Sequence, residues 1–107
     1  MMQAQMRYSS LEQFISQRGS ALAKGPISVV LVEDDVEVDT TLRHNLQCGF
    51  EHVLAFMPAE FDLPRDLQET IERIDYDTAR EGATEAAINA IIEAAPKQWI
   101  YYCYNAE

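Results

Sequence analysis

The sequence predicts an α/β fold in which a mostly parallel sheet of about four strands is flanked by helices. Short apolar runs alternate with segments of helical periodicity along the 107 residues. The run at 27–32 is continuous and rich in β-branched residues, which is typical of a strand covered on both faces. An acidic turn, a helical pattern, a glycine and a second apolar run follow it, and this succession indicates a βαβ unit.

The first 25 residues are expected to form a helix and a linker ahead of the main domain. Ser9 and Glu12 have the spacing of a capping box, with Ser9 as the N-cap. Apolar residues at helical spacing follow, and Gly19 can end the helix. This pattern leaves open whether the helix packs on the domain or extends from it. The α/β domain itself is expected to span 26–107.

The rest of the chain alternates between helical and extended patterns. Five further elements are predicted: a helix over 36–48, strands over 50–57 and 70–77, a helix over 84–95 and a strand over 99–104. Gly49 is expected to end the first of these helices, and Thr84 to cap the second. Because alternate residues of a strand face opposite sides, we expect the aromatic residues of the last strand to pack in the core: Trp99, Tyr101, Tyr102 and Tyr104.

Composition and charge exclude several classes of function. Acidic residues outnumber basic ones by 18 to 8, and the scattered lysines and arginines argue against a nucleic-acid partner. No apolar run reaches the roughly 20 residues that membrane insertion requires, and residues 1–19 lack a signal-peptide core. We therefore expect a cytoplasmic protein. His44 and His52 have no nucleophile at a recognisable spacing and are expected to be structural. The sequence does not predict the assembly state.

Three acids, Glu33, Asp34 and Asp35, come directly after the strand predicted at 27–32. In α/β sheets, ligands bind at the carboxyl ends of the strands. Carboxylates there accept hydrogen bonds from ribose hydroxyls. The sequence therefore predicts a ligand site at these acids, while the same residues also suit the first turn of the following helix, where acids favour the helix dipole.

One resemblance starts from the same acids. Residues 31–35 resemble the first strand and acidic pair of the receiver domains of bacterial response regulators, which hold Mg²⁺. This resemblance implies a signalling domain that binds Mg²⁺. The later pattern departs from it, because no apolar strand that ends in aspartate and is followed by Met-Pro appears after Phe56, and Lys97 precedes the last strand instead of ending it.

A second resemblance covers more of the chain. Residues 46–53 read Leu-Gln-Cys-Gly-Phe-Glu-His-Val, and 27–56 as a whole is similar to the opening of GT-A glycosyltransferases of the family 2 type. The resemblance implies a half-Rossmann lobe that binds a nucleotide-sugar donor and belongs to a transferase of hexosyl groups. It also implies that Glu33, Asp34 and Asp35 contact the ribose or base of the donor.

The similarity resumes at 87–91 and 99–100, before the position of the family's Asp-x-Asp motif. In that family the motif holds Mg²⁺ or Mn²⁺ against the donor diphosphate. Here its two aspartates are replaced by Tyr104 and Ala106, which leaves Asn105 and Glu107 as weak candidate metal ligands. Because the motif is degraded and the acceptor-binding half is missing, the chain looks truncated at its C-terminus and is expected to be inactive alone. No catalytic residue is assigned, and a non-catalytic protein-interaction domain is a further alternative.

Overall fold

The computed structural model describes residues 6–34 and 37–104 of the chain. Its elements in chain order are β1 (Arg7–Tyr8), α1 (Leu11–Arg18), the 3-10 helix η1 (Gly19–Ala23), β2 (Ile27–Leu31), α2 (Val38–Gln47), β3 (His52–Met57), α3 (Arg65–Gln68), β4 (Glu72–Asp75), α4 (Ala83–Ala94) and β5 (Ile100–Tyr104). All strand pairs are parallel, and the sheet order is β1-β4-β3-β2-β5. The predicted α/β class is confirmed, with five strands instead of about four.

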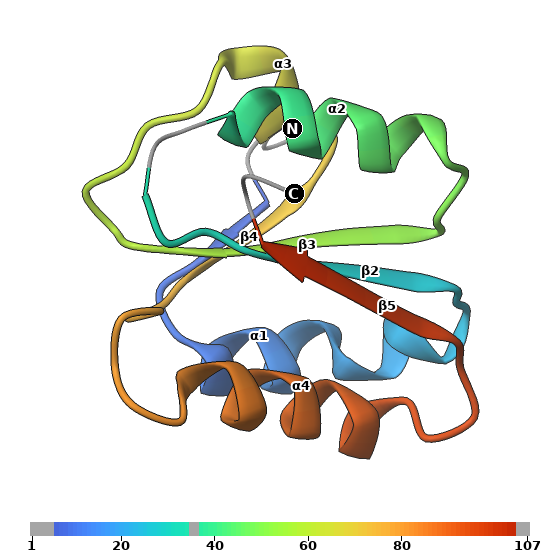
Figure 1. Cartoon of the computed structure of the whole chain (residues 1–107). Coiled ribbons are helices and arrows are strands. Elements are labelled where there is room, and N and C mark those ends of the chain that lie inside the picture. The colour runs from blue at the N-terminus through green and yellow to red at the C-terminus, as the bar shows by residue number, and fades with distance from the viewer. Residues whose placement is uncertain (1–5, 35–36, 105–107) are drawn as a thin grey trace.

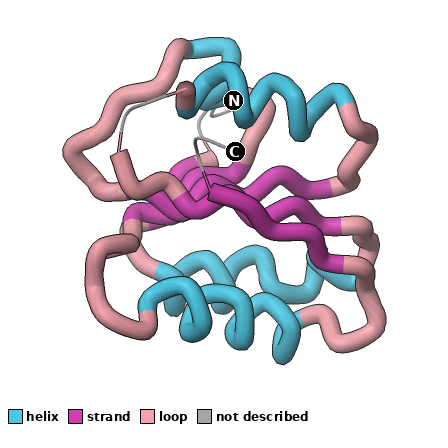
Figure 2. The backbone as a smooth tube through the Cα atoms, in the orientation of Figure 1, coloured by secondary structure: helices cyan, strands magenta, loops and turns pink. Residues whose placement is uncertain are grey.

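Helices cover both faces of the sheet, as Figures 1 and 2 show. On one face lie α1 and α4, and on the other lie α2 and α3. Every residue of β2 and β3 is buried, because these two strands sit inside the sheet and between the helix layers. This burial explains why 27–32 is apolar at every position except Ser28.

The N-terminal segment packs on the sheet. Phe14 of α1 and Leu22 of η1 are fully buried in the same cluster as Ile27 and Val29 of β2. Tyr8 of β1 meets the Phe14 ring edge-on, with the centroids 5.1 Å apart. The strand β1 was not predicted, since two residues paired with β4 are too short to show an alternating pattern.

Two helices begin at positions that differ from the predicted ones. The N-cap of α1 is Ser10, whose Oγ accepts a 3.0 Å hydrogen bond from the backbone N–H of Gln13. The Gln13 side chain reaches back and accepts from the backbone N–H of Ser9 at 2.6 Å. The N-cap therefore lies one residue later than the predicted Ser9, and Gln13, instead of Glu12, reaches back, but it bonds the N–H of Ser9 and not that of the N-cap Ser10.

The helix α4 begins at Ala83 and not at a Thr84 cap. Gly82 precedes it with φ of 78°, a left-handed conformation that suits glycine. The Thr84 hydroxyl instead lies 3.3 Å from the Tyr104 hydroxyl. Gly49 follows α2 with φ of 86°, which confirms its predicted role in ending that helix.

The aromatic residues of the last strand are more exposed than predicted. Trp99, Tyr101 and Tyr102 are exposed by 86%, 53% and 50%, so the expectation of core packing is wrong for all three. The reason is that β5 lies at the edge of the sheet, where the helices cover its side chains only in part. Tyr101 stacks on Phe50 instead, with ring centroids 5.9 Å apart.

The strand order contains a change of direction at β2. From β2 the chain adds β3 and then β4 on one side, and it returns to place β5 on the other side. The order β4-β3-β2-β5 corresponds to the 3-2-1-4 portion of the Rossmann sheet. Ligands of such sheets bind outside the carboxyl ends of the strands near this switch point.

Candidate functional site

Two of the three predicted ligand-binding acids lie just beyond β2. The Val32 N–H donates to the carbonyl of Phe56 at 2.9 Å, and the buried Thr78 hydroxyl donates to the Val32 carbonyl at 2.6 Å. After Val32 the chain leaves the sheet, and Glu33 and Asp34 are exposed. Asp35 lies outside the described residues. Both described acids therefore stand at the carboxyl end of a buried parallel strand.

Glu33 lines a surface hollow of about 600 Å³ at this end of the sheet. The hollow collects side chains from the segments that follow β2, β3 and β4, because parallel strands all end at the same edge. Four carboxylates are among its lining residues: Glu33, Glu60, Asp75 and Asp77. The hollow is therefore acidic, and it suits a ligand that donates hydrogen bonds or carries positive charge.

Two arginines bind Asp75, which is one of the lining residues of this hollow. Asp75 forms ion pairs with Arg7 at 3.0 Å and with the buried Arg73 at 3.2 Å. Arg73 also donates to the carbonyls of Pro58 and Ala59, each at 3.1 Å, and Arg7 donates to Ala59 at 3.0 Å. Burial lowers the pKa of the Arg73 guanidinium, and the charge of Arg7 lowers it further. These bonds fasten the loop after β3 to β4 and β1.

Tyr76 forms another wall of the hollow. Its ring meets Phe56 edge-on, with the centroids 5.2 Å apart, and its hydroxyl donates to the Ala83 carbonyl at 2.8 Å. The guanidinium of Arg80 lies 5.7 Å from the ring centroid. Burial raises the pKa of the Tyr76 phenol, so this wall stays neutral at ordinary pH. The contacts with Phe56, Ala83 and Arg80 fix the orientation of the Tyr76 side chain.

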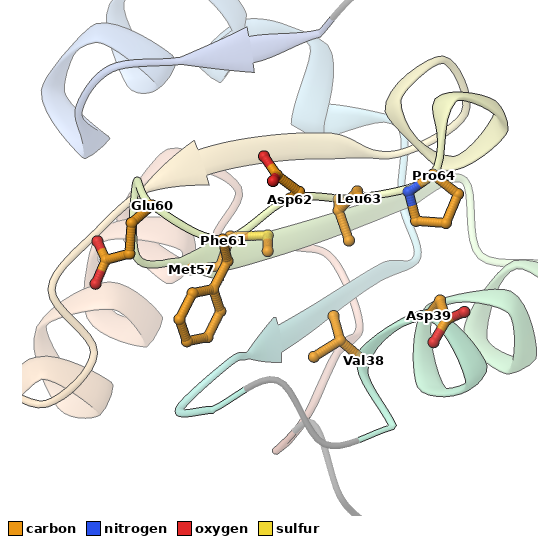
Figure 3. Close-up of a pocket in the computed structure, with 8 residues that line it drawn as sticks. All are labelled: Val38, Asp39, Met57, Glu60, Phe61, Asp62, Leu63 and Pro64. Atoms are coloured by element: carbon orange, nitrogen blue, oxygen red, sulfur yellow. The ribbon is translucent and has the colours of Figure 1, made fainter.

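A second hollow, of about 450 Å³, lies between the first turn of α2 and the loop after β3. It shares Glu60 and Phe61 with the first hollow. Figure 3 shows the apolar side chains of Val38 and Phe61 between the carboxylates of Glu60 and Asp39. Glu37, directly before α2, has φ of 57°, a left-handed conformation that costs about 1 kcal/mol for a residue with a side chain. The carboxyl end thus carries both hollows and this strained residue.

The described residues form no cluster of metal-ligating side chains. Within 6–34 and 37–104, no three His, Cys, Asp or Glu side chains are grouped so that they could hold a metal. The weak metal ligands predicted from the sequence, Asn105 and Glu107, lie outside these ranges. We therefore derive no step that depends on a metal.

A third charged cluster lies at the opposite, amino end of the sheet and was not predicted. His52 Nδ1 lies 3.1 Å from the buried Glu72 carboxylate, and Arg18 approaches the same carboxylate at 3.3 Å. The other ring nitrogen of His52, Nε2, lies 3.0 Å from the carbonyl of Ala21. Since a carbonyl only accepts, Nε2 donates this bond. His52 has the structural role that was expected, because its ring connects the Glu72 carboxylate with the Ala21 carbonyl.

Comparisons of this chain with protein-family models, curated proteins and solved structures find no match. The structure itself defines a parallel α/β domain with a Rossmann-like arrangement. None of the helices in the described part of the chain has the length and apolar character needed to cross a membrane.

Proposed function

We propose that this domain binds the nucleoside portion of a nucleotide-sugar donor in the acidic hollow at the carboxyl end of the sheet. The observation that carries the proposal is the position of Glu33, which follows a fully buried parallel strand and lines a hollow of about 600 Å³. The carboxylate of Glu33 accepts hydrogen bonds from ribose hydroxyls there. Glu60 and Asp77 add further acceptors from the loops after β3 and β4.

The strand order supports this class of ligand over the signalling alternative. The order β4-β3-β2-β5 follows the nucleotide-binding half of a Rossmann sheet. Receiver domains have the order 2-1-3-4-5, in which the third strand lies beside the first. In this chain the corresponding strand, β4, pairs with β3 and β1 instead of β2. The arrangement therefore favours a nucleoside ligand.

The negative charge of the site disfavours binding of the phosphates of such a donor. Rossmann sheets hold phosphates with a glycine-rich turn after the first strand and the N–H groups of the next helix. Here the turn after β2 carries Glu33 and Asp34, and no lysine or arginine is among the described residues that line the hollow. Because these charges repel a diphosphate, we expect the nucleoside to supply the binding free energy.

The proposal is tested by isothermal titration calorimetry in buffer without divalent metal. The compounds titrated into the protein are uridine, guanosine, UDP-glucose and GDP-mannose. We expect one nucleoside to bind, and its diphosphate sugar to bind more weakly. Glu33→Gln should weaken nucleoside binding about tenfold, because the hydrogen bonds lose a charged acceptor. Glu93→Gln, an equal charge change at an exposed position late in α4, should have no effect. Binding of none of the four compounds, or a Glu33→Gln variant that binds normally, would remove the proposal.

A further inference from the structure

Within the described part of the chain, the edge strand β5 lacks the features that normally prevent edge strands from pairing. Proteins protect such edges with short strands, charged residues, proline, or a covering helix or loop. Residues 100–104 form five consecutive strand residues without charge, proline or glycine. Figures 1 and 2 show no described helix or strand outside β5. The opposite edge, β1, has only two residues, and its Arg7 is ion-paired with Asp75.

The pairing of β5 with β2 determines which of its backbone groups face outward. The N–H of Ile27 donates to the carbonyl of Trp99 at 2.9 Å, so the Trp99 carbonyl points toward β2. Successive residues of a strand direct their N–H and C=O groups to opposite sides. Ile100, Tyr102 and Tyr104 therefore direct these groups away from β2, at the open edge of the sheet.

We propose that β5 pairs with β5 of a second copy of this chain, antiparallel, about a two-fold axis at Tyr102. This register places Tyr102 opposite Tyr102 of the second copy, and Ile100 opposite Tyr104 of the second copy. All three residues with outward backbone groups then form hydrogen-bonded pairs. If the register shifts by one residue, some of these outward backbone groups have no hydrogen-bond partner in the second copy. The two sheets join into one continuous sheet through a self-complementary contact.

Exposed apolar side chains lie on both sides of this edge. On the α2 face, Tyr101 and Phe50 form a stacked pair. On the α4 face, Tyr102 is 50% exposed and Ile92 is 44% exposed, with the partly buried Ile88 one turn earlier in α4. Aromatic residues placed opposite each other across antiparallel strands stabilise the pair. The two-fold arrangement covers these side chains in both copies at once.

Charge complementarity favours a second copy as the occupant. The contact between Thr84 and Tyr104 places the start of α4 near the carboxyl end of β5. Lys97 follows α4 and precedes β5, so it lies near the amino end of the same strand. Glu85 and Lys97 are both exposed. Because the two strands run antiparallel, Glu85 of each copy approaches Lys97 of the other, and this opposite-charge pair occurs twice.

Sedimentation velocity of the chain tests the proposal in about 0.15 M salt, where the net charge of −10 is largely screened. We expect a reversible dimer with a dissociation constant of about 1–100 µM. Tyr102→Lys should yield a monomer, because the two introduced charges face each other at the axis. Gln17→Lys introduces the same charge at an exposed position of α1 and should leave the dimer intact. Circular dichroism confirms that each variant is folded.

A charge exchange tests the predicted orientation. Glu85→Lys and Lys97→Glu should each raise the dissociation constant about fivefold, and the double variant should restore it. A wild-type chain that remains monomeric at about 1 mM overturns the proposal. So does a dimer that Tyr102→Lys leaves unchanged, or an edge that pairs only with an added basic peptide. The result is independent of the nucleoside titration, because the Glu33→Gln variant should dimerise normally.

Discussion

Charged side chains at the two ends of the parallel sheet differ in their exposure to solvent. At the amino end, Glu72 and His52 are 5% and 9% exposed, and Arg18 completes an ion-paired cluster with them. At the carboxyl end, Asp75 is ion-paired with Arg7 and the buried Arg73, and the exposed Glu33 and Glu60 also line an acidic hollow. Buried charges persist only when they are paired, whereas exposed like charges cost little stability and remain accessible to a ligand. The comparison therefore separates a structural end from a candidate binding end.

The hydrogen-bond pattern supports this separation. No buried side-chain nitrogen or oxygen in the described part of the chain lacks a hydrogen-bond partner. Within the core, the Ser28 hydroxyl donates to Asn45 at 2.6 Å, and Asn45 donates to the Thr41 carbonyl at 2.8 Å. Polar groups inside the domain are thus used for structure.

The largest expected difference between the two ends is in stability. Glu72→Ala leaves His52 and Arg18 without their carboxylate, and it should lower the free energy of unfolding by about 3 kcal/mol. Glu33→Ala at the carboxyl end should change it by no more than about 0.5 kcal/mol. Urea unfolding of both variants measures the contrast. Equal losses at the two ends would contradict the assignment of a structural and a binding end.

Alkaline pH should produce a smaller loss that involves two tyrosines. Burial raises the pKa of Tyr8, with a further contribution from the charge of Glu72, and burial also raises the pKa of Tyr76 beside the hollow. Each folded-state pKa lies above the ordinary value of 10.0, so folding favours the neutral phenol. This stability is complete below pH 10.0 and is lost as pH rises through the folded pKa values.

Urea unfolding between about pH 8 and about pH 11 should show this decline. Tyr8→Phe should make the decline shallower, because it removes one of the two phenols whose pKa is raised by folding. A decline that Tyr8→Phe and Tyr76→Phe together leave unchanged would show that other groups cause it. The pair of variants also shows which of the two tyrosines contributes more to the decline.

The smallest effect is expected at an exposed ion pair outside both ends. Arg43 of α2 hydrogen-bonds Asp66 of α3 and lowers the pKa of that carboxyl. A lowered carboxyl pKa stabilises the fold above the unfolded value, and the contribution is lost as pH falls through the folded value. Because the pair is exposed to solvent, Asp66→Asn should not change the unfolding midpoint measurably.

An NMR titration of the Asp66 carboxyl checks the cause of this shift. Arg43→Gln should return the pKa toward its ordinary value while the unfolding midpoint stays constant. A stability loss comparable to that of Glu72→Ala would mean that exposed pairs matter as much as the buried cluster, and the contrast between them would disappear.

Local sequence patterns were sufficient for most of the architecture. The almost wholly apolar run at 27–32 predicted a strand covered on both faces, and β2 is fully buried. Gly49 marked the end of α2 because its positive φ suits glycine. The position of Glu33 and Asp34 beyond the first long strand was also readable, since a turn after such a strand leads to the carboxyl end of the sheet. These features depend on neighbouring residues only.

The tertiary structure decided which side chains meet and which remain exposed. Arg18, His52 and Glu72 are brought together by the pairing of β4 with β3 and by the packing of α1, and no local spacing encodes that meeting. The exposure of Tyr101 and Tyr102 follows from the place of β5 at the sheet edge. An aromatic strand has the same pattern inside a sheet or at its edge, because strand order depends on contacts between residues far apart in the chain.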